Sequence, residues 1–154
     1  DLISQSSEQE LADIIYKYGE ERYSRRIARN IKAIQPLTKV TNLKEAVRRS
    51  TPPQKRHKTL ARVFQALRIA VNGELVKLEA FLDSFVNHLT LGGRVVIISY
   101  HSLEDRMVKH TFRALKKAGR LKVLTKKPIT PTEYEIAQNG RSRSAKLRAA
   151  EKVA

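Results

Sequence analysis

An apolar run that passes directly into a helical pattern constrains the fold of this chain more than any other feature. Val95 to Ser99 reads VVIIS, and beyond it Val108, Phe112 and Leu115 recur at helical spacing. A short, wholly apolar run is typical of a strand buried on both faces of a parallel sheet. A strand followed at once by an amphipathic helix indicates an α/β fold. In open α/β sheets, ligands bind at the carboxyl ends of such strands.

The corner between this strand and helix is polar. Ser102 is predicted to cap the helix, with Glu104 and Asp105 in its first turn, where the positive end of the helix dipole favours acidic residues. Asp105 could also brace the loop through an ion pair with Arg106. The corner is therefore a candidate site with a competing structural explanation.

Two more strands and one more helix are predicted after this corner. Leu121 to Leu124 reads LKVL and predicts a second strand, and after a turn at Asn139–Gly140 the chain finishes in a third strand or a basic tail. Between them, Thr130 to Glu133 predicts a helix start with Pro131 at the first helical position. Helices thus alternate with strands in this half of the chain.

The N-terminal third predicts helices only. Ser7 to Glu10 forms a capping box, and apolar residues from Leu11 to Tyr18 follow at helical spacing. Gly19 is predicted to end this helix in the left-handed conformation. Two further helical patterns end before Pro36 and before Pro52.

A basic linker is predicted from Pro52 to Thr59, and the longest helical pattern follows, from Leu60 to Leu89. We expect that pattern to break at Asn72–Gly73, because glycine inside a helix costs about 1 kcal/mol relative to alanine. The chain is accordingly divided into a helical subdomain, residues 1–55, and an α/β part, residues 56–154.

The charge balance indicates a polyanionic partner. Thirty-one Lys and Arg stand against fifteen Asp and Glu, a formal net charge of +16. Neutralising phosphates with such cations drives nucleic-acid binding; a solubilising surface or contact with an anionic membrane is the alternative. The lack of cysteine excludes disulfides and zinc–thiolate sites. No apolar run is long enough for a transmembrane helix, and the polar, acidic N-terminus is neither a signal nor a transit peptide.

The six glycines form no GxGxxG or P-loop motif, and neither HExxH nor GxSxG occurs. We therefore expect no nucleotide fingerprint and no metal site in this chain. It is predicted to be the back half of an α/β enzyme whose nucleotide-binding half lies upstream.

Four blocks of the sequence resemble the RsmH (MraW) family. They are Tyr18 to Ile31 (YGEERYSRRIARNI), Phe64 to Leu75 (FQALRIAVNGEL), Gly92 to Lys109 (GGRVVIISYHSLEDRMVK) and Gly140 to Lys152 (GRSRSAKLRAAEK). The resemblance implies an S-adenosylmethionine-dependent enzyme that methylates N4 of a cytidine in 16S ribosomal RNA. It also implies a cytoplasmic protein whose partner is small-subunit ribosomal RNA or the subunit itself, with no membrane involvement.

The resemblance further implies a class I, Rossmann-like methyltransferase fold with an all-helical insert. Residues 1–55 would be the insert and residues 56–154 the C-terminal half of the catalytic domain. The family's S-adenosylmethionine-binding residues lie mainly in the N-terminal half, so we expect no cofactor-binding residue here and no activity of this chain alone. The alternative is a non-catalytic, basic RNA-binding module on the same scaffold.

Methylating an exocyclic amine chiefly requires that the amine be positioned against the methyl group, in a pocket for a single-stranded or flipped base. Tyr100, His101 and Ser102 are the candidate substrate-pocket residues, as a stacking surface, an imidazole and a hydroxyl. For Ser102 the helix cap is favoured, and for His101 a site role and a structural role are both open. No residue is assigned as catalytic.

Cationic residues in three segments are candidate RNA contacts. They are Arg22, Arg25 and Arg26, Lys126 and Lys127, and Arg141, Arg143, Lys146 and Arg148. Alternation would place Arg141 and Arg143 on one face of an extended segment. A solvated tail is the alternative for this last group.

Overall fold

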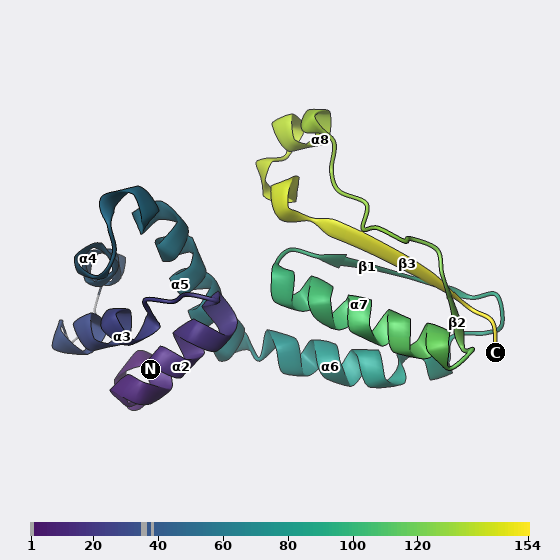
Figure 1. Cartoon of the computed structure of the whole chain (residues 1–154), viewed down its shortest axis with the longest axis horizontal. Coiled ribbons are helices and arrows are strands. Elements are labelled where there is room, and N and C mark those ends of the chain that lie inside the picture. The colour runs from purple at the N-terminus through teal and green to yellow at the C-terminus, as the bar shows by residue number, and fades with distance from the viewer. Residues whose placement is uncertain (1, 35–36, 38) are drawn as a thin grey trace. The chain divides into compact units, whose positions relative to one another are not determined.

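The computed structural model describes residues 2–34, 37 and 39–154, and the chain forms two compact units. The helical unit is Asp1–Glu74 and the sheet unit is Leu75–Ala154. Figure 1 shows helices in the first and a sheet with helices in the second. The division falls later than the boundary expected after residue 55, because the long helix that follows packs against the N-terminal helices.

The helical unit contains five α-helices and one short 3-10 helix among the described residues. They are α1 (Leu2–Gln5), α2 (Glu8–Gly19), α3 (Ser24–Ala33), α4 (Val40–Ser50), η1 (Pro53–Lys55) and α5 (Arg56–Asn72). The prediction of a basic linker from Pro52 to Thr59 is wrong, because η1 and the start of α5 occupy most of this segment. Pro36, expected to follow the second long helix, lies outside the described residues.

Local signals explain how α2 and α5 are bounded. At the start of α2 the Glu10 amide donates to the Ser7 hydroxyl at 3.2 Å and the Ser7 amide donates to the Glu10 carboxylate at 2.7 Å, which confirms the capping box. Hydrogen bonding of the Glu10 carboxylate with the Ser7 backbone, and then with the Ser7 side chain, lowers the pKa of Glu10. The break at Asn72–Gly73 is also confirmed: α5 ends there and Gly73 has the left-handed φ of 60°.

Glycine at position 19 has a different role from the predicted one. The left-handed residue after α2 is Glu20, with φ 49°, and Gly19 is the last helical residue. A Cβ at Gly19 would lie 2.8 Å from the backbone carbonyl oxygen of Arg62 in α5. Gly19 therefore permits close approach of α2 to α5, with buried side chains such as Leu11, Ile15 and Val63 in the core of this unit.

In the sheet unit all three predicted strands are present. The elements are α6 (Glu74–Ser84, whose first residue belongs to the helical unit), η2 (Phe85–His88), β1 (Arg94–Ser99), α7 (Ser102–Lys117), β2 (Leu121–Val123), α8 (Glu133–Gln138), η3 (Gly140–Ser144) and β3 (Lys146–Lys152). The combination of helices with a small sheet is consistent with the α/β class, but the parallel pairing expected for Val95 to Ser99 is wrong. Thr132 caps α8, so Pro131 precedes the cap and the prediction that it opens the helix is wrong.

The strand order is β1-β3-β2, and both pairings are antiparallel. β1 and β2 consequently run parallel to each other without pairing, because β3 lies between them. The expectation that Val95 to Ser99 is buried on both faces is wrong here: Val96 and Ile98 are 57% and 51% exposed. Antiparallel sheets often have one face packed and the other open.

The packed face of the sheet is covered by α7. Val108 and Phe112 from α7 are buried with Val95 of β1, Leu121 of β2 and Ala150 of β3. The ring of Phe112 lies 6.0 Å from that of Phe85. No helix in the described part of the chain is long and apolar enough to cross a membrane.

Gly19→Ala should lower the free energy of unfolding by about 1–3 kcal/mol, the usual cost of overpacking. The added methyl group would meet the Arg62 carbonyl, and backbone cannot move aside as a flexible side chain can. Gly140→Ala is the matched control, because nothing lies within 4 Å of a Cβ there. Urea unfolding measures both; equal effects of the two substitutions would show that α2 and α5 do not approach closely at Gly19.

Candidate nucleic-acid interface

The corner between β1 and α7 is organised by the carboxylate of Glu104. It accepts a hydrogen bond from the Tyr100 amide at 2.8 Å and another from the His101 amide at 3.3 Å. The sequence predicted Glu104 to act on the helix dipole, and the structure adds these direct bonds. They fold the end of β1 back over the first turn of α7.

The cap of α7 is His101, not Ser102 as predicted. The His101 Nδ1 accepts from the Glu104 amide at 3.3 Å, which completes a capping box, and Ser102 is the first helical residue. Because Nδ1 is the acceptor, the neutral ring carries its hydrogen on Nε2, 3.4 Å from the Glu104 carboxylate. The residue is 8% exposed. These contacts give His101 a structural role, whereas Tyr100 at 53% exposure and Ser102 are open to solvent.

Asp105 joins α7 to β3 through a buried ion pair with Arg148. The Arg148 Nε donates to Oδ1 at 2.7 Å and its Nη2 donates to Oδ2 at 3.2 Å, and each residue is 8% exposed. Lys146 lies 3.7 Å from the same carboxylate. The Arg148 guanidinium holds the pKa of Asp105 below its usual value. The structure shows a bracing ion pair of Asp105 with Arg148 of β3, and the pair with Arg106 stays a prediction.

The predicted RNA contacts separate into two groups by exposure. Arg148 is buried and bound to Asp105, so it is part of the fold, and Lys146 is partly engaged with the same carboxylate. The exposed members are Arg22, Arg25, Arg26, Lys126, Lys127, Arg141 and Arg143. Arg141 and Arg143 lie in the 3-10 helix η3, so the extended segment predicted for them is wrong.

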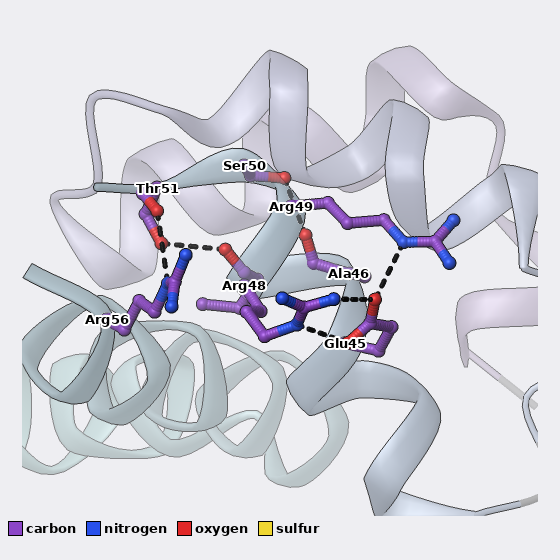
Figure 2. Close-up of polar contacts among 8 residues, drawn as sticks. Glu45, Ala46, Arg48, Arg49, Ser50, Thr51 and Arg56 are labelled. Carbon is purple, nitrogen blue, oxygen red and sulfur yellow. Dashed lines mark hydrogen bonds and ion pairs between the residues drawn. The ribbon is translucent and has the colours of Figure 1, made fainter. Parts of the chain in front are cut away.

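Two other arginines of the helical unit are held by a neighbouring carboxylate. Figure 2 shows Glu45 between Arg48 and Arg49, with hydrogen bonds of 2.6 and 2.7 Å from Arg48 and 2.8 Å from Arg49. Those from Arg48, then from Arg49, lower the pKa of Glu45 to about 2. Beside them, the Arg56 Nε donates to the Thr51 carbonyl at 3.3 Å and so links the end of α4 to the start of α5.

A pocket in the helical unit holds cations that the sequence reasoning did not select. Lys55, Lys58 and Arg62 line it, opposite Arg22 and its neighbours. Their spacing of three and then four residues is helical, and it would have placed them on one face. Because Pro52 to Thr59 was predicted to be a linker, the helical spacing of these three cations did not enter the prediction.

Both units carry exposed cations, and the sheet unit has a polar corner after β1. These features make the chain a candidate nucleic-acid-binding protein. Comparison with known proteins narrows the class: residues 1–153 match the MraW methylase family, and the chain belongs to that family. It is 57% identical over 99% of its length to the ribosomal RNA small subunit methyltransferase H of Nostoc punctiforme, and 51% identical over 99% to that of Kosmotoga olearia. It covers 51% and 53% of those two proteins, about half the length of the curated relatives it matches.

Asp105→Asn should destabilise the chain by about 3 kcal/mol at pH 7, because removing one partner leaves the buried Arg148 guanidinium without its counter-charge. Asp83→Asn, at an exposed position of α6, is the control and should change stability little. Urea unfolding measures both.

The same pair predicts a pH dependence. Since the folded pKa of Asp105 is lowered, its contribution is complete above the unfolded pKa of about 3.9 and is lost as the pH falls through the folded value. The stability difference between wild type and Asp105→Asn should stay constant from about pH 7 to 5 and shrink below about pH 4. A difference that does not change down to acid pH would contradict the ion pair.

Proposed function

We propose that the protein containing this chain transfers a methyl group from S-adenosylmethionine to N4 of a cytidine in small-subunit ribosomal RNA. One observation carries the proposal: the whole chain matches relatives named ribosomal RNA small subunit methyltransferase H at 50–57% identity. The exposed cations of both units support an RNA substrate, since phosphate neutralisation supplies much of the affinity for nucleic acids. A ribosomal substrate would place the reaction in the cytoplasm.

We further propose that the sheet unit is part of a larger Rossmann-like catalytic domain into which the helical unit is inserted. Among the described residues β1 pairs only with β3, so its other edge is open to a further strand. Val96 and Ile98 project from the sheet face opposite α7 and are half exposed. Large apolar side chains side by side on a sheet favour a covering layer. The chain's coverage of half of its relatives leaves room for that layer in the rest of the protein.

A cation-lined pocket of the helical unit does not fit S-adenosylmethionine. The pocket of about 270 Å³ in the helical unit is lined by Arg22, Lys55, Lys58 and Arg62, which would repel the positively charged sulfonium. Gly92 and Gly93 form a turn closed by a bond from the Gly93 amide to the Thr90 carbonyl, before β1 rather than after it. In this proposal the cofactor is bound chiefly by other parts of the protein.

This chain would contribute to substrate positioning at the corner after β1. Tyr100 presents an exposed ring on which a single-stranded base can stack, and the neighbouring Ser102 is also exposed. His101 and Glu104 would hold these two side chains in place through the capping box. In the sheet unit, Lys126 and Lys127 or the arginines of η3 would contact the RNA backbone.

The activity is tested by incubating a protein of the relatives' full length with labelled S-adenosylmethionine and small-subunit ribosomal RNA, then mapping the modified nucleotide. We expect one N4-methylated cytidine. Calorimetric titration of S-adenosylmethionine should show binding to the longer protein and none to the 154-residue chain. Tight binding of S-adenosylmethionine to the 154-residue chain would contradict the proposal that other parts of the protein bind the cofactor. RNA binding without methyl transfer would favour a non-catalytic RNA-binding module.

Tyr100→Ala in the longer protein should lower kcat/KM for methyl transfer by about 5- to 150-fold, because stacking of a base on an aromatic ring contributes about 1–3 kcal/mol. Tm should change little, since the ring is 53% exposed. Tyr134→Ala, at a 77% exposed position of α8, is the matched control. Unchanged methyl transfer by Tyr100→Ala would remove Tyr100 from the substrate pocket.

A further inference from the structure

The pocket of the helical unit is formed where the connection between α2 and α3 faces the start of α5. Glu21, Arg22 and Tyr23 line one side, and Lys55, Lys58 and Arg62 line the other. Its volume is about 270 Å³. That is slightly below the roughly 300–1,000 Å³ of pockets for drug-sized molecules. A phosphate with part of a nucleotide fits such a space better than a whole cofactor does.

The floor of the pocket is rigid because Glu21 is buried and hydrogen-bonded. It is 1% exposed, accepts from the Thr59 hydroxyl at 3.0 Å and from the Tyr23 amide at 3.0 Å, and has the Arg62 Nη1 at 3.5 Å. A buried carboxylate needs such partners, since leaving it without them is costly. Glu21 thus connects the α2–α3 loop to α5 through these hydrogen bonds, and the positive charge of Arg62 balances its negative charge.

The remaining charges of the pocket are positive. Lys55 and Lys58 are exposed, and neither makes an ion pair with a carboxylate of the described part of the chain. Arg22 lies with its guanidinium 5.0 Å from the centroid of the Tyr23 ring and donates to the Tyr23 hydroxyl at 3.1 Å. With Glu21 matched by Arg62, three further cations remain around the pocket and make a site for an anion.

We propose that this pocket binds a backbone phosphate of single-stranded RNA, with Lys55 and Lys58 as its direct ligands. Arg22, held beside Tyr23 by the bond to its hydroxyl, would present its guanidinium for the adjoining base to stack on, as Arg planes do in single-stranded RNA recognition. The pocket is an anchoring subsite for the RNA and rests on the proposed RNA substrate. It lies in the helical unit, whereas Tyr100 belongs to the sheet unit.

The test is the anisotropy of a fluorescein-labelled, single-stranded RNA decamer titrated with the full chain at several salt concentrations. Lys55→Gln with Lys58→Gln should raise Kd about tenfold for RNAs of different sequence. It should also lower the slope of log K against log salt by about 0.7, the value for one phosphate on a single strand. Lys55→Arg with Lys58→Arg should retain wild-type affinity.

Lys17→Gln with Lys44→Gln is the matched control, because it removes the same charge from exposed helix positions of the same unit outside the pocket. It should leave Kd within about twofold of wild type. Equal weakening by both double variants would overturn the proposal, since net charge alone would then explain binding. Displacement of the RNA by inorganic phosphate at an equal concentration of phosphate groups would also overturn it, in favour of a free-anion site.

Failure of this subsite and failure of the proposed activity have different signatures. If the longer protein methylates RNA while the pocket variant binds RNA as the control does, the subsite is wrong and the activity stands. If the pocket variant alone loses RNA affinity and the longer protein transfers no methyl group, the subsite stands and the activity is wrong. Binding of phosphatidylserine vesicles that depends on Lys55 and Lys58, without RNA binding, would replace RNA by a membrane surface.

Discussion

The sheet unit depends on the buried ion pair between Asp105 and Arg148. Removing two charges from water costs several kcal/mol for each ion, and attraction offsets that cost only when the geometry is good. Two hydrogen bonds of 2.7 and 3.2 Å between planar groups provide such geometry. Asp105 lies in the first turn of α7 and Arg148 in the middle of β3, the strand that pairs with both others. The pair therefore sets where α7 begins relative to the whole sheet.

The position of the corner that carries Tyr100 depends on the same ion pair. The capping box of His101 and Glu104 lies in the same helical turn as Asp105, so the corner that exposes Tyr100 is fixed by a contact with a strand 43 residues further along the chain. Arg148 points to the packed face because it is two residues from the buried Ala150, and alternate residues of a strand share a face. Its place in β3 brings its charge to Asp105, so Arg148 stabilises the fold.

Features with a local cause were predictable from sequence. The capping box at Ser7, the break at Gly73 and the three strands follow from hydrogen bonds or backbone preferences within a few residues. Features with distant causes were not. The need for glycine at position 19 arises from the Arg62 carbonyl of α5, and the antiparallel pairing of β1 arises from a strand at the end of the chain.

The candidate site divides in the same way. That a polar corner follows β1 was readable from the sequence, whereas the choice of His101 over Ser102 as cap depends on how the imidazole lies in three dimensions. The pocket at Lys55 and Lys58 escaped notice because the prolines before it indicated a linker. Its cations come together only when α5 packs against the α2–α3 connection through Glu21 and Thr59.

In a chain with about twice as many cations as carboxylates, the carboxylates decide which cations can bind a ligand. Glu45 engages Arg48 and Arg49, and Asp105 engages Arg148 and Lys146. Glu21, the carboxylate that lines the helical pocket, is used by Thr59 and Arg62, and no carboxylate among the described residues pairs with the lysines there. A high net charge alone would attract RNA to any surface. A pocket in which several cations surround a rigid floor can instead hold one phosphate in a defined place. Such a fixed phosphate is needed to position a base for chemistry.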